Sequence, residues 1–334
     1  MRKLAYALCA TIVFFAACKK SVSPSVDNVA DEPQAITKRY CAADEILQQQ
    51  LQTDPGLQQR MNQIEEFTNR FIQSGEMSRL VGDTIEIPVV VHVLYNTAAQ
   101  NISDAQVNSQ IAVLNEDFQN RNADKTKLPA NSFQTVASTG LNVRFVLARA
   151  PIHKKTRTKS FSTNDAVKKS SRGGDDPIDP THNLNIWVCN LGQGLLGYAQ
   201  FPGGNSATDG VVILYSAFGS RAKYPQGTYV SSFDLGRTAT HEVGHWMNLR
   251  HIWGDDGTGC SGSDLVTDTP NQGSENYGCP AFPHVSCSNG PTGDMFMNYM
   301  DYTDDACMYM FSQGQKARAL AVFAAGGPRA LMGQ

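Results

Sequence analysis

Hydrophobic residues between positions 44 and 74 recur at steps of three and four, the spacing of one helix face. A Pro55-Gly56 pair interrupts the pattern upstream of the recurring residues, which are Leu57, Met61, Ile64, Phe67 and Phe71. Glutamine, glutamate and asparagine fill most of the positions between them, so the segment is amphipathic and needs a surface on which to dock. A helix of the main domain and a separate docking segment would both account for this pattern.

The next apolar run, from Ile85 to Leu94, is rich in β-branched residues and almost continuous, which is typical of a strand buried on both faces. His92 lies inside this run, and we interpret it as a hydrogen-bonded core residue. Ser103 is the predicted N-cap of a following helix, and further strands are predicted over residues 141–147, 184–188 and 211–214. Strand, helix and strand in this order predict an α/β fold with a mixed sheet.

The composition narrows the class of protein. The chain has 334 residues, enough for one large domain or two small ones, and a formal net charge of −3. Because nucleic-acid-binding proteins normally carry a strong basic excess, we expect no nucleic-acid partner. Basic side chains do gather between Lys154 and Arg172, but serine, threonine and glycine separate them without a pattern of stacking aromatic residues. We therefore interpret residues 153–176 as a solvated loop.

The first eighteen residues have the features of an export signal. Positions 2 and 3 are basic, and the apolar stretch Leu4–Ala17 is too short to span a bilayer. The sequence ending in Ala17-Cys18 resembles the lipobox of bacterial lipoproteins, in which the cysteine is lipidated. We expect residues 1–18 to be a lipoprotein-type signal peptide that attaches the protein to a membrane through Cys18, and residues 19–37 to be a flexible tether. Cleavage near Ala17 without lipidation, and hence secretion, is the alternative.

The sequence HEVGHWMNLRH at residues 241–251 has the spacing of a zinc site. His241 and His245 are four residues apart, so on a helix they project from one face and can share one metal ion. Glu242 is close to that metal and can accept a proton from a metal-bound water. His251 can join them only if the helix ends and the chain turns back, and Asn248 suits the left-handed backbone of such a turn. Three histidine ligands leave one position for water, as in catalytic zinc sites.

A second motif, NYMDY at residues 298–302, follows about fifty residues later. Together the two motifs resemble the metzincin metalloproteases, and with the surrounding cysteines they are similar to the pappalysin family, in its ulilysin-like bacterial branch. The resemblance implies a two-subdomain metzincin fold over residues 80–334, with a mixed twisted sheet, a zinc-binding helix and an irregular, disulfide-stapled C-terminal subdomain. Met300 would form the apolar base beneath the zinc, and Tyr302 would stand over the scissile carbonyl.

The activity implied by this resemblance is that of a zinc endopeptidase acting on protein or peptide substrates. We expect the enzyme to be a monomer and its substrate to lie extended along an edge strand near Leu195–Phe201. A non-catalytic, zinc-retaining binding or adhesion lipoprotein is the alternative function. Such a protein would need the three histidines but not Glu242, which is present.

Four of the eight cysteines follow the zinc motif, and their spacing alone leaves three pairings open. The resemblance implies the pairs Cys260–Cys287 and Cys279–Cys307. Cys41, preceded by Arg39-Tyr40, is similar to the pro-segment cysteine that can occupy the open zinc position in zymogens of this group. Residues 38–79 would then be an inhibitory propeptide removed near Arg79-Leu80, which would make Cys41 a latency switch; an unpaired exported thiol is the alternative.

Two further expectations concern the C-terminal part of the chain. Asp264, Asp268 and Thr269 lie among glycines, and the resemblance favours a calcium site at these clustered oxygen ligands, with a polar, turn-rich loop as the alternative. Basic-specific relatives carry an acidic residue directly before the last cysteine, whereas this chain has Ala306 there, with Asp304 and Asp305 just before it. The sequence therefore does not support a preference for Arg or Lys in the substrate.

Overall fold

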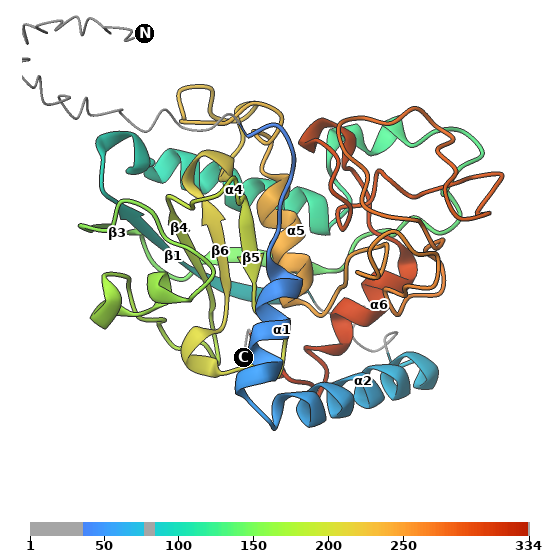
Figure 1. The fold of residues 1–334 in the computed structure, drawn as a ribbon, viewed down its shortest axis with the longest axis horizontal. Coiled ribbons are helices and arrows are strands. Elements are labelled where there is room, and N and C mark those ends of the chain that lie inside the picture. Colours follow the sequence, from blue (N-terminus) through green and yellow to red (C-terminus); the bar gives the residue numbers. More distant parts are fainter. Residues whose placement is uncertain (1–35, 77–83, 333–334) are drawn as a thin grey trace, which may run out of the picture. The chain divides into compact units, whose positions relative to one another are not determined.

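One six-stranded sheet lies at the centre of the fold in the computed structural model, which describes residues 36–76 and 84–332 (Figure 1). The signal peptide with Cys18, most of the tether and the expected cleavage point lie outside the described residues. The strands are β1 (Ile85–Tyr95), β2 (Val143–Leu147), β3 (Ile152–Lys155), β4 (Leu184–Cys189), β5 (Gly197–Ala199) and β6 (Val211–Leu214).

The sheet is mixed, as the sequence predicted. Its strand order is β2-β1-β4-β6-β5, and β3 pairs with the end of β1 beyond β2. All pairings are parallel except that of β5 with β6, where Tyr198 lies opposite Val212. β5 is therefore an antiparallel edge strand, which leaves one side of its backbone open for pairing with another extended segment.

The helices are α1 (Ala43–Thr53), α2 (Leu57–Ser74), α4 (Asp104–Phe118), α5 (Arg237–Trp246) and α6 (Gln313–Ala321). Ser103 caps α4 as predicted, because its side chain accepts a hydrogen bond from the Gln106 N–H. Short 3₁₀ helices cover Ala98–Gln100, Ala123–Lys127, Ala166–Lys168, Ser170–Arg172, Ser206–Thr208, Tyr215–Ala217 and Asp305–Cys307. No helix among the described residues is both long and apolar enough to cross a membrane.

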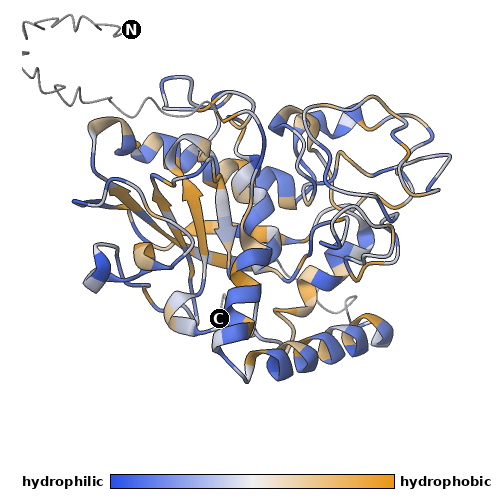
Figure 2. Cartoon of the chain, viewed as in Figure 1, coloured by the Kyte–Doolittle hydropathy of each residue, from blue (hydrophilic) through white to orange (hydrophobic). Residues whose placement is uncertain are grey.

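Successive side chains along the strands point to opposite faces of the sheet, so a hydrophobic core lies on each face. Val91 and Val93 of β1 pack with residues of α4, α5 and α6 on one face, whereas Leu94 packs with Trp187 and Tyr198 on the other. Strands β1, β4 and β6 are apolar over most of their length (Figure 2). His92 is buried within β1 and hydrogen-bonds to Asp175 and Asn185, which confirms its interpretation as a satisfied core residue.

The interpretation of residues 153–176 as a solvated loop was partly wrong. Strand β3 begins one residue before this segment, and its other three residues belong to the segment and to the sheet. Lys168 is fully buried, and its Nζ lies 2.7 Å from the Thr208 carbonyl and 3.0 Å from Asp165. The basic side chains did not indicate solvent exposure here, because a lysine that donates to a carbonyl and pairs with a carboxylate can be buried.

The amphipathic segment forms two helices, α1 and α2, with the predicted break at Pro55-Gly56. α1 packs against β5, and α2 packs against α6 (Figure 1). Leu57 and Phe71 of α2 are buried, and Phe71 contacts Ala321 and Ala324 at the end of α6. The surface on which this segment docks is therefore the remainder of the chain.

The C-terminal region between α5 and α6 is irregular and contains two disulfides. They join Cys260 to Cys287 and Cys279 to Cys307, the pairs implied by the family resemblance. Each closes a loop of just under thirty residues, which lowers the conformational entropy of the unfolded chain and so stabilises this irregular region. Cys189 is a buried free thiol in β4.

Candidate active site

Helix α5 presents two of the predicted zinc ligands from one buried face. His241 and His245 are both fully buried. The helix ends at Trp246, and Asn248 adopts φ 71°, the left-handed conformation predicted from its residue type. The Leu249 N–H donates to the Gly244 carbonyl as the chain reverses, and this turn brings His251 back to the other two histidines.

The protonation of the three imidazoles follows from their partners. Nδ1 of His241 faces the Tyr299 carbonyl at 2.7 Å, Nδ1 of His245 faces the Leu249 carbonyl at 2.8 Å, and Nδ1 of His251 faces Asp255 at 2.6 Å. Because these oxygens can only accept, each Nδ1 carries the proton and each Nε2 carries a lone pair. Burial also lowers the pKa of His241 and of His245, which favours the neutral ligand form.

The three lone pairs converge on one point. Nε2 of His245 lies 3.1 Å from Nε2 of His241 and 3.0 Å from Nε2 of His251. Nitrogen ligands at 2.0–2.1 Å from a tetrahedral zinc ion lie about 3.4 Å apart, close to this arrangement. The donor set therefore fits zinc, and Cys41 Sγ is a fourth ligand atom within 4.8 Å of the others.

Asp255 is a part of the site that sequence reasoning missed. It lies four residues after His251 with φ 57°, and its carboxylate accepts the Nδ1–H bond of that ligand. Such a carboxylate fixes the orientation of the ring and raises its basicity as a ligand. Its place four residues after His251 was visible in the sequence, but the pair Asp255-Asp256 in a glycine-rich loop does not reveal which residue each carboxylate contacts.

Cys41 contacts Glu242 and Tyr302 at once. Its thiol donates to Glu242 Oε2 at 3.2 Å, its backbone N–H donates to the Tyr302 hydroxyl at 3.3 Å, and that hydroxyl donates to the Cys41 carbonyl at 2.9 Å. Burial raises the pKa of Glu242 to about 8. Burial and the nearby carboxylate of Glu242 raise the pKa of the Cys41 thiol, so a thiolate at this position requires a cation beside it.

Met300 lies beneath α5. A Cβ at Gly244 would come within 2.4 Å of Met300 Sδ, so the helix can approach the methionine only with glycine at this position. Tyr299, next in the same turn, provides the carbonyl that accepts from His241. The motif at residues 298–302 thus supplies the floor of the histidine cluster and one of its hydrogen-bond acceptors.

The segment around Cys41 pairs with the edge strand that was expected to bind substrate. Cys41 bridges Gly197 in parallel orientation, the Leu196 N–H donates to the Tyr40 carbonyl, and the Ala42 N–H donates to the Gly197 carbonyl. A Cβ at Gly197 would lie 2.9 Å from both Cγ and Oε1 of Glu242. The absence of a side chain on Gly197 therefore lets the carboxylate lie against the edge strand.

Arg39 fills a pocket on one side of the histidine cluster. Its guanidinium lies 2.6 Å from Asp305, 3.1 Å from Thr238 and 3.2 Å from the Thr303 carbonyl. Ala306, directly before Cys307, is exposed, whereas the adjacent Asp305 is fully buried and its carboxylate pairs with Arg39. An acid therefore lies in this pocket, and the preference for a substrate side chain stays a prediction.

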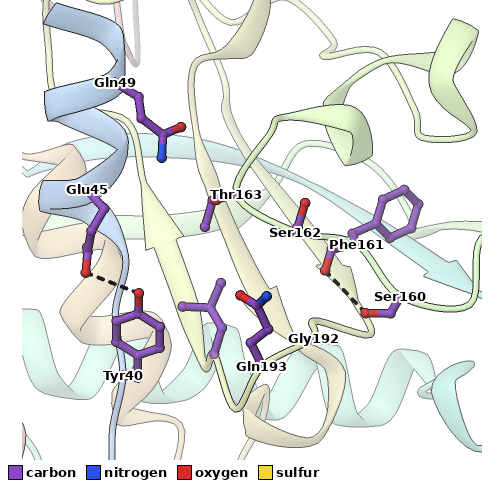
Figure 3. Close-up of a pocket in the computed structure, with 10 residues that line it drawn as sticks. Tyr40, Glu45, Gln49, Ser160, Phe161, Ser162, Thr163, Gly192 and Gln193 are labelled. Carbon is purple, nitrogen blue, oxygen red and sulfur yellow. Dashed lines mark hydrogen bonds between the residues drawn. The ribbon is translucent and has the colours of Figure 1, made fainter. Parts of the chain in front are cut away.

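A cavity of about 290 Å³ lies beside the same segment (Figure 3). Tyr40, Glu45 and Gln49 form one wall, and Ser160–Thr163 with Gly192–Gln193 form much of the other. Tyr40 donates to Glu45 across 3.2 Å. None of the three histidines lines this cavity, so it is a neighbour of the metal site and not part of it.

The three candidate calcium ligands are only partly brought together. The Thr269 hydroxyl donates to both carboxylate oxygens of Asp264, whose pKa burial raises to about 7. Asp268 instead accepts from the Ser312 hydroxyl and the Gly314 N–H at the start of α6. Asp268 thus stabilises the helix terminus through hydrogen bonds to the first turn.

Comparisons with known proteins agree with this geometry. Residues 170–324 match the model of the peptidase M43 family, described as pregnancy-associated plasma protein-A. An extracellular metalloprotease of Pyricularia oryzae is 35% identical over 245 residues, which cover 72% of this chain and 75% of that protein. One of Verticillium alfalfae is 33% identical over 254 residues, covering 75% of this chain and 78% of that protein.

Solved structures resemble most of the described fold. Mature mirolysin of Tannerella forsythia in complex with a cleaved peptide has a TM-score of 0.72 and 52% identity, covering 75% of this chain and 96% of its own. A mutant of promirolysin from the same organism has a TM-score of 0.80 and 47% identity, covering 88% of this chain and 97% of its own. The fold and its histidine cluster define a zinc metalloendopeptidase of the metzincin type. The chain belongs to the pappalysin family, as the two sequence motifs indicated.

Proposed function

We propose that the protein is the latent precursor of an exported zinc endopeptidase, in which residues 38–79 block the active site until they are removed. One observation carries the proposal: Cys41 engages every group that peptide hydrolysis would use. Its thiol lies beside the three imidazole nitrogens and donates to Glu242, while its backbone occupies the Tyr302 hydroxyl. A substrate cannot reach these groups while Cys41 holds them.

The roles of the residues follow from their positions. His241, His245 and His251 would hold the zinc ion, which when bound would polarise a water molecule and the scissile carbonyl. Glu242, once freed from Cys41, would accept a proton from the attacking water and deliver it to the leaving amine.

The neighbouring residues Tyr302 and Met300 would complete the site. Burial raises the pKa of Tyr302, so its hydroxyl keeps its proton and can donate to the developing oxyanion. Met300 would support the metal site from below through its contact with Gly244.

The promirolysin structure supports the assignment of a pro-segment, because it matches a larger share of this chain than mature mirolysin does. The pro-segment also indicates a substrate preference. All three guanidinium nitrogens of Arg39 donate in this pocket, to Asp305, Thr238 and the Thr303 carbonyl, so the mature enzyme would accept an arginine side chain there. Lysine, with a single charged nitrogen, would bind less well.

Two expectations from the sequence stay predictions. Related proteins named extracellular metalloproteases support export, but lipidation of Cys18 concerns a residue outside the described ones. A calcium ion would need Asp264 as an anion, so its binding would oppose the raised pKa of this carboxyl.

The decisive experiment compares the full chain, the chain after removal of residues 1–79 and a Glu242→Ala variant of the latter on an arginine-containing peptide library. We expect cleavage by the shortened wild type only, and its loss on chelation of zinc. A Cys41→Ala variant of the full chain should cleave without processing. Activity in the Glu242→Ala variant would contradict the assigned base, and a fully active unprocessed wild type would contradict latency.

A further inference from the structure

The pro-segment covers two arginines on the side of the metal site opposite to the Arg39 pocket. The chain crosses the histidine cluster at Cys41 and continues into α1 and α2. There, Glu65 of α2 receives two hydrogen bonds from Arg318, at 2.8 and 2.7 Å. The Arg318 side chain is 1% exposed, so this bidentate ion pair is nearly closed to solvent on the arginine side.

Arg250 lies beside this ion pair and close to the catalytic cleft. Its guanidinium is 5.1 Å from the centre of the Phe201 ring, and that ring is 5.3 Å from the ring of His245. Arg250 is therefore within about 10 Å of a metal ligand, which is the span of roughly three residues of extended chain. Phe201 follows β5, so the arginine flanks the continuation of the edge strand.

Two hydrogen-bond donors at this place have no partner among the described residues. They are Nε of Arg250 and Nδ2 of Asn248, and both atoms are buried. Asn248 is 4% exposed, and with Arg250, Pro202 and Leu265 it lines a cavity of about 130 Å³ whose other wall is α2. Because a buried donor without an acceptor is costly, a cavity with two of them suits an anionic or strongly accepting group.

The charges around the cavity also favour an anion. Arg318 lies near enough to Arg250 for the two positive charges to repel each other, and the carboxylates of Asp255, Asp44 and Glu65 lie near enough to Arg250 to attract it. Asp255 is already engaged by His251. Asp44 and Glu65 belong to the pro-segment. Its removal would therefore leave Arg250 and Arg318 without these two neighbouring negative charges.

We propose that in the mature enzyme Arg250, Arg318 and Asn248 bind an acidic side chain of the substrate, about three residues from the scissile bond and on the side away from the arginine-binding pocket. In the precursor, Glu65 occupies part of this site. The inference rests on the proposed function, because the site opens only when residues 38–79 leave. The preferred substrate would thus carry a basic residue on one side of the scissile bond and an acidic residue on the other.

The test uses the mature enzyme and matched peptides with one fixed arginine for the Asp305 pocket. Glutamate or glutamine is placed at each of the second to fifth positions across the scissile bond, and kcat/KM is measured for each peptide. We expect glutamate to exceed glutamine by about threefold to tenfold near the third position, mainly through KM. The ratio should fall as salt is raised, because the arginines become exposed.

Arg250→Gln should bring this ratio close to one. The matched control is Arg149→Gln, since Arg149 is exposed and follows β2 at the opposite edge of the sheet. If Arg250→Gln folds poorly, the salt dependence of the wild-type ratio provides the same answer. Equal rates for glutamate and glutamine at every position, or an unchanged ratio in Arg250→Gln, would overturn the site. Failure to cleave any peptide would instead overturn the proposed function and this inference with it.

Discussion

Replacing Arg39 by alanine tests how firmly the pro-segment is held. Arg39 is 2% exposed, and its charge is matched by the fully buried Asp305. The variant would leave that carboxylate buried without its cation, a change that costs about 3–5 kcal/mol. Asp305 keeps its hydrogen bonds from the N–H groups of Leu235 and Arg237, so the lower end of this range applies. About 3 kcal/mol corresponds to a shift in the docking equilibrium on the order of a hundredfold.

The assay measures initial rates of hydrolysis of a quenched fluorescent peptide by the intact, zinc-loaded full chain. Gels taken during the reaction verify that the chain remains uncut. We expect Arg39→Ala to exceed the wild type by on the order of a hundredfold, limited by the activity of the mature enzyme. Arg70→Ala, on the exposed face of α2, is the control and should remain latent. An Arg39→Ala protein as latent as the wild type would refute the role given to the Asp305 pocket.

Three further predictions concern the metal site, the base and a buried carboxyl. Asp255→Ala should weaken zinc affinity by about tenfold to a hundredfold in competition with a chelator, because the ring of His251 loses its acceptor; an unchanged affinity would contradict the role of Asp255. Gly197→Ala should lower kcat of the mature enzyme by about tenfold or more, since the new methyl group would displace Glu242, and a normal kcat would show that this close approach is not needed. Asp264 has a folded-state pKa of about 7 and an unfolded value near 3.8, so it stabilises the fold below pH 4 and loses this contribution as the pH rises through 7. Chemical denaturation should therefore show a flatter decline between pH 4 and 7 for Asp264→Asn than for the wild type, and parallel curves would disprove the shifted pKa.

Local patterns in the sequence predicted the elements well. The hydrophobic spacing of α2, the N-cap of α4 and the left-handed turn at Asn248 each depend on residues close together in the chain. β3 was missed because four residues, of which three are basic or histidine, have no apolar periodicity. Its pairing is set by β1, more than fifty residues earlier, and a strand that is stabilised by its partner has a weak pattern of its own.

Only the part of the candidate site that lies within short sequence motifs could be predicted. His241, His245, Glu242 and His251 lie within eleven residues, so helix geometry and one turn bring them together. Asp305 meets Arg39 across 266 positions, and Glu65 meets Arg318 across 253. No spacing rule relates such pairs, because the fold of the whole chain determines them. The calcium expectation came from clustered loop oxygens and the family resemblance, and it stays a prediction; the sequence did not indicate that the oxygens of Asp268 accept hydrogen bonds at the start of α6.

The proposed pro-segment contacts residues on both sides of the metal site, through Arg39 on one side and Glu65 on the other. A cut near Arg79 would break none of the contacts made by residues 36–76. It would only sever the covalent link that keeps this segment at a high effective concentration near the cleft. For the latent precursor proposed above, processing and activation would therefore be separate events, and activation would depend on dilution. At high protein concentration the excised segment would rebind and act as a free inhibitor, whereas dispersal after export would let it diffuse away.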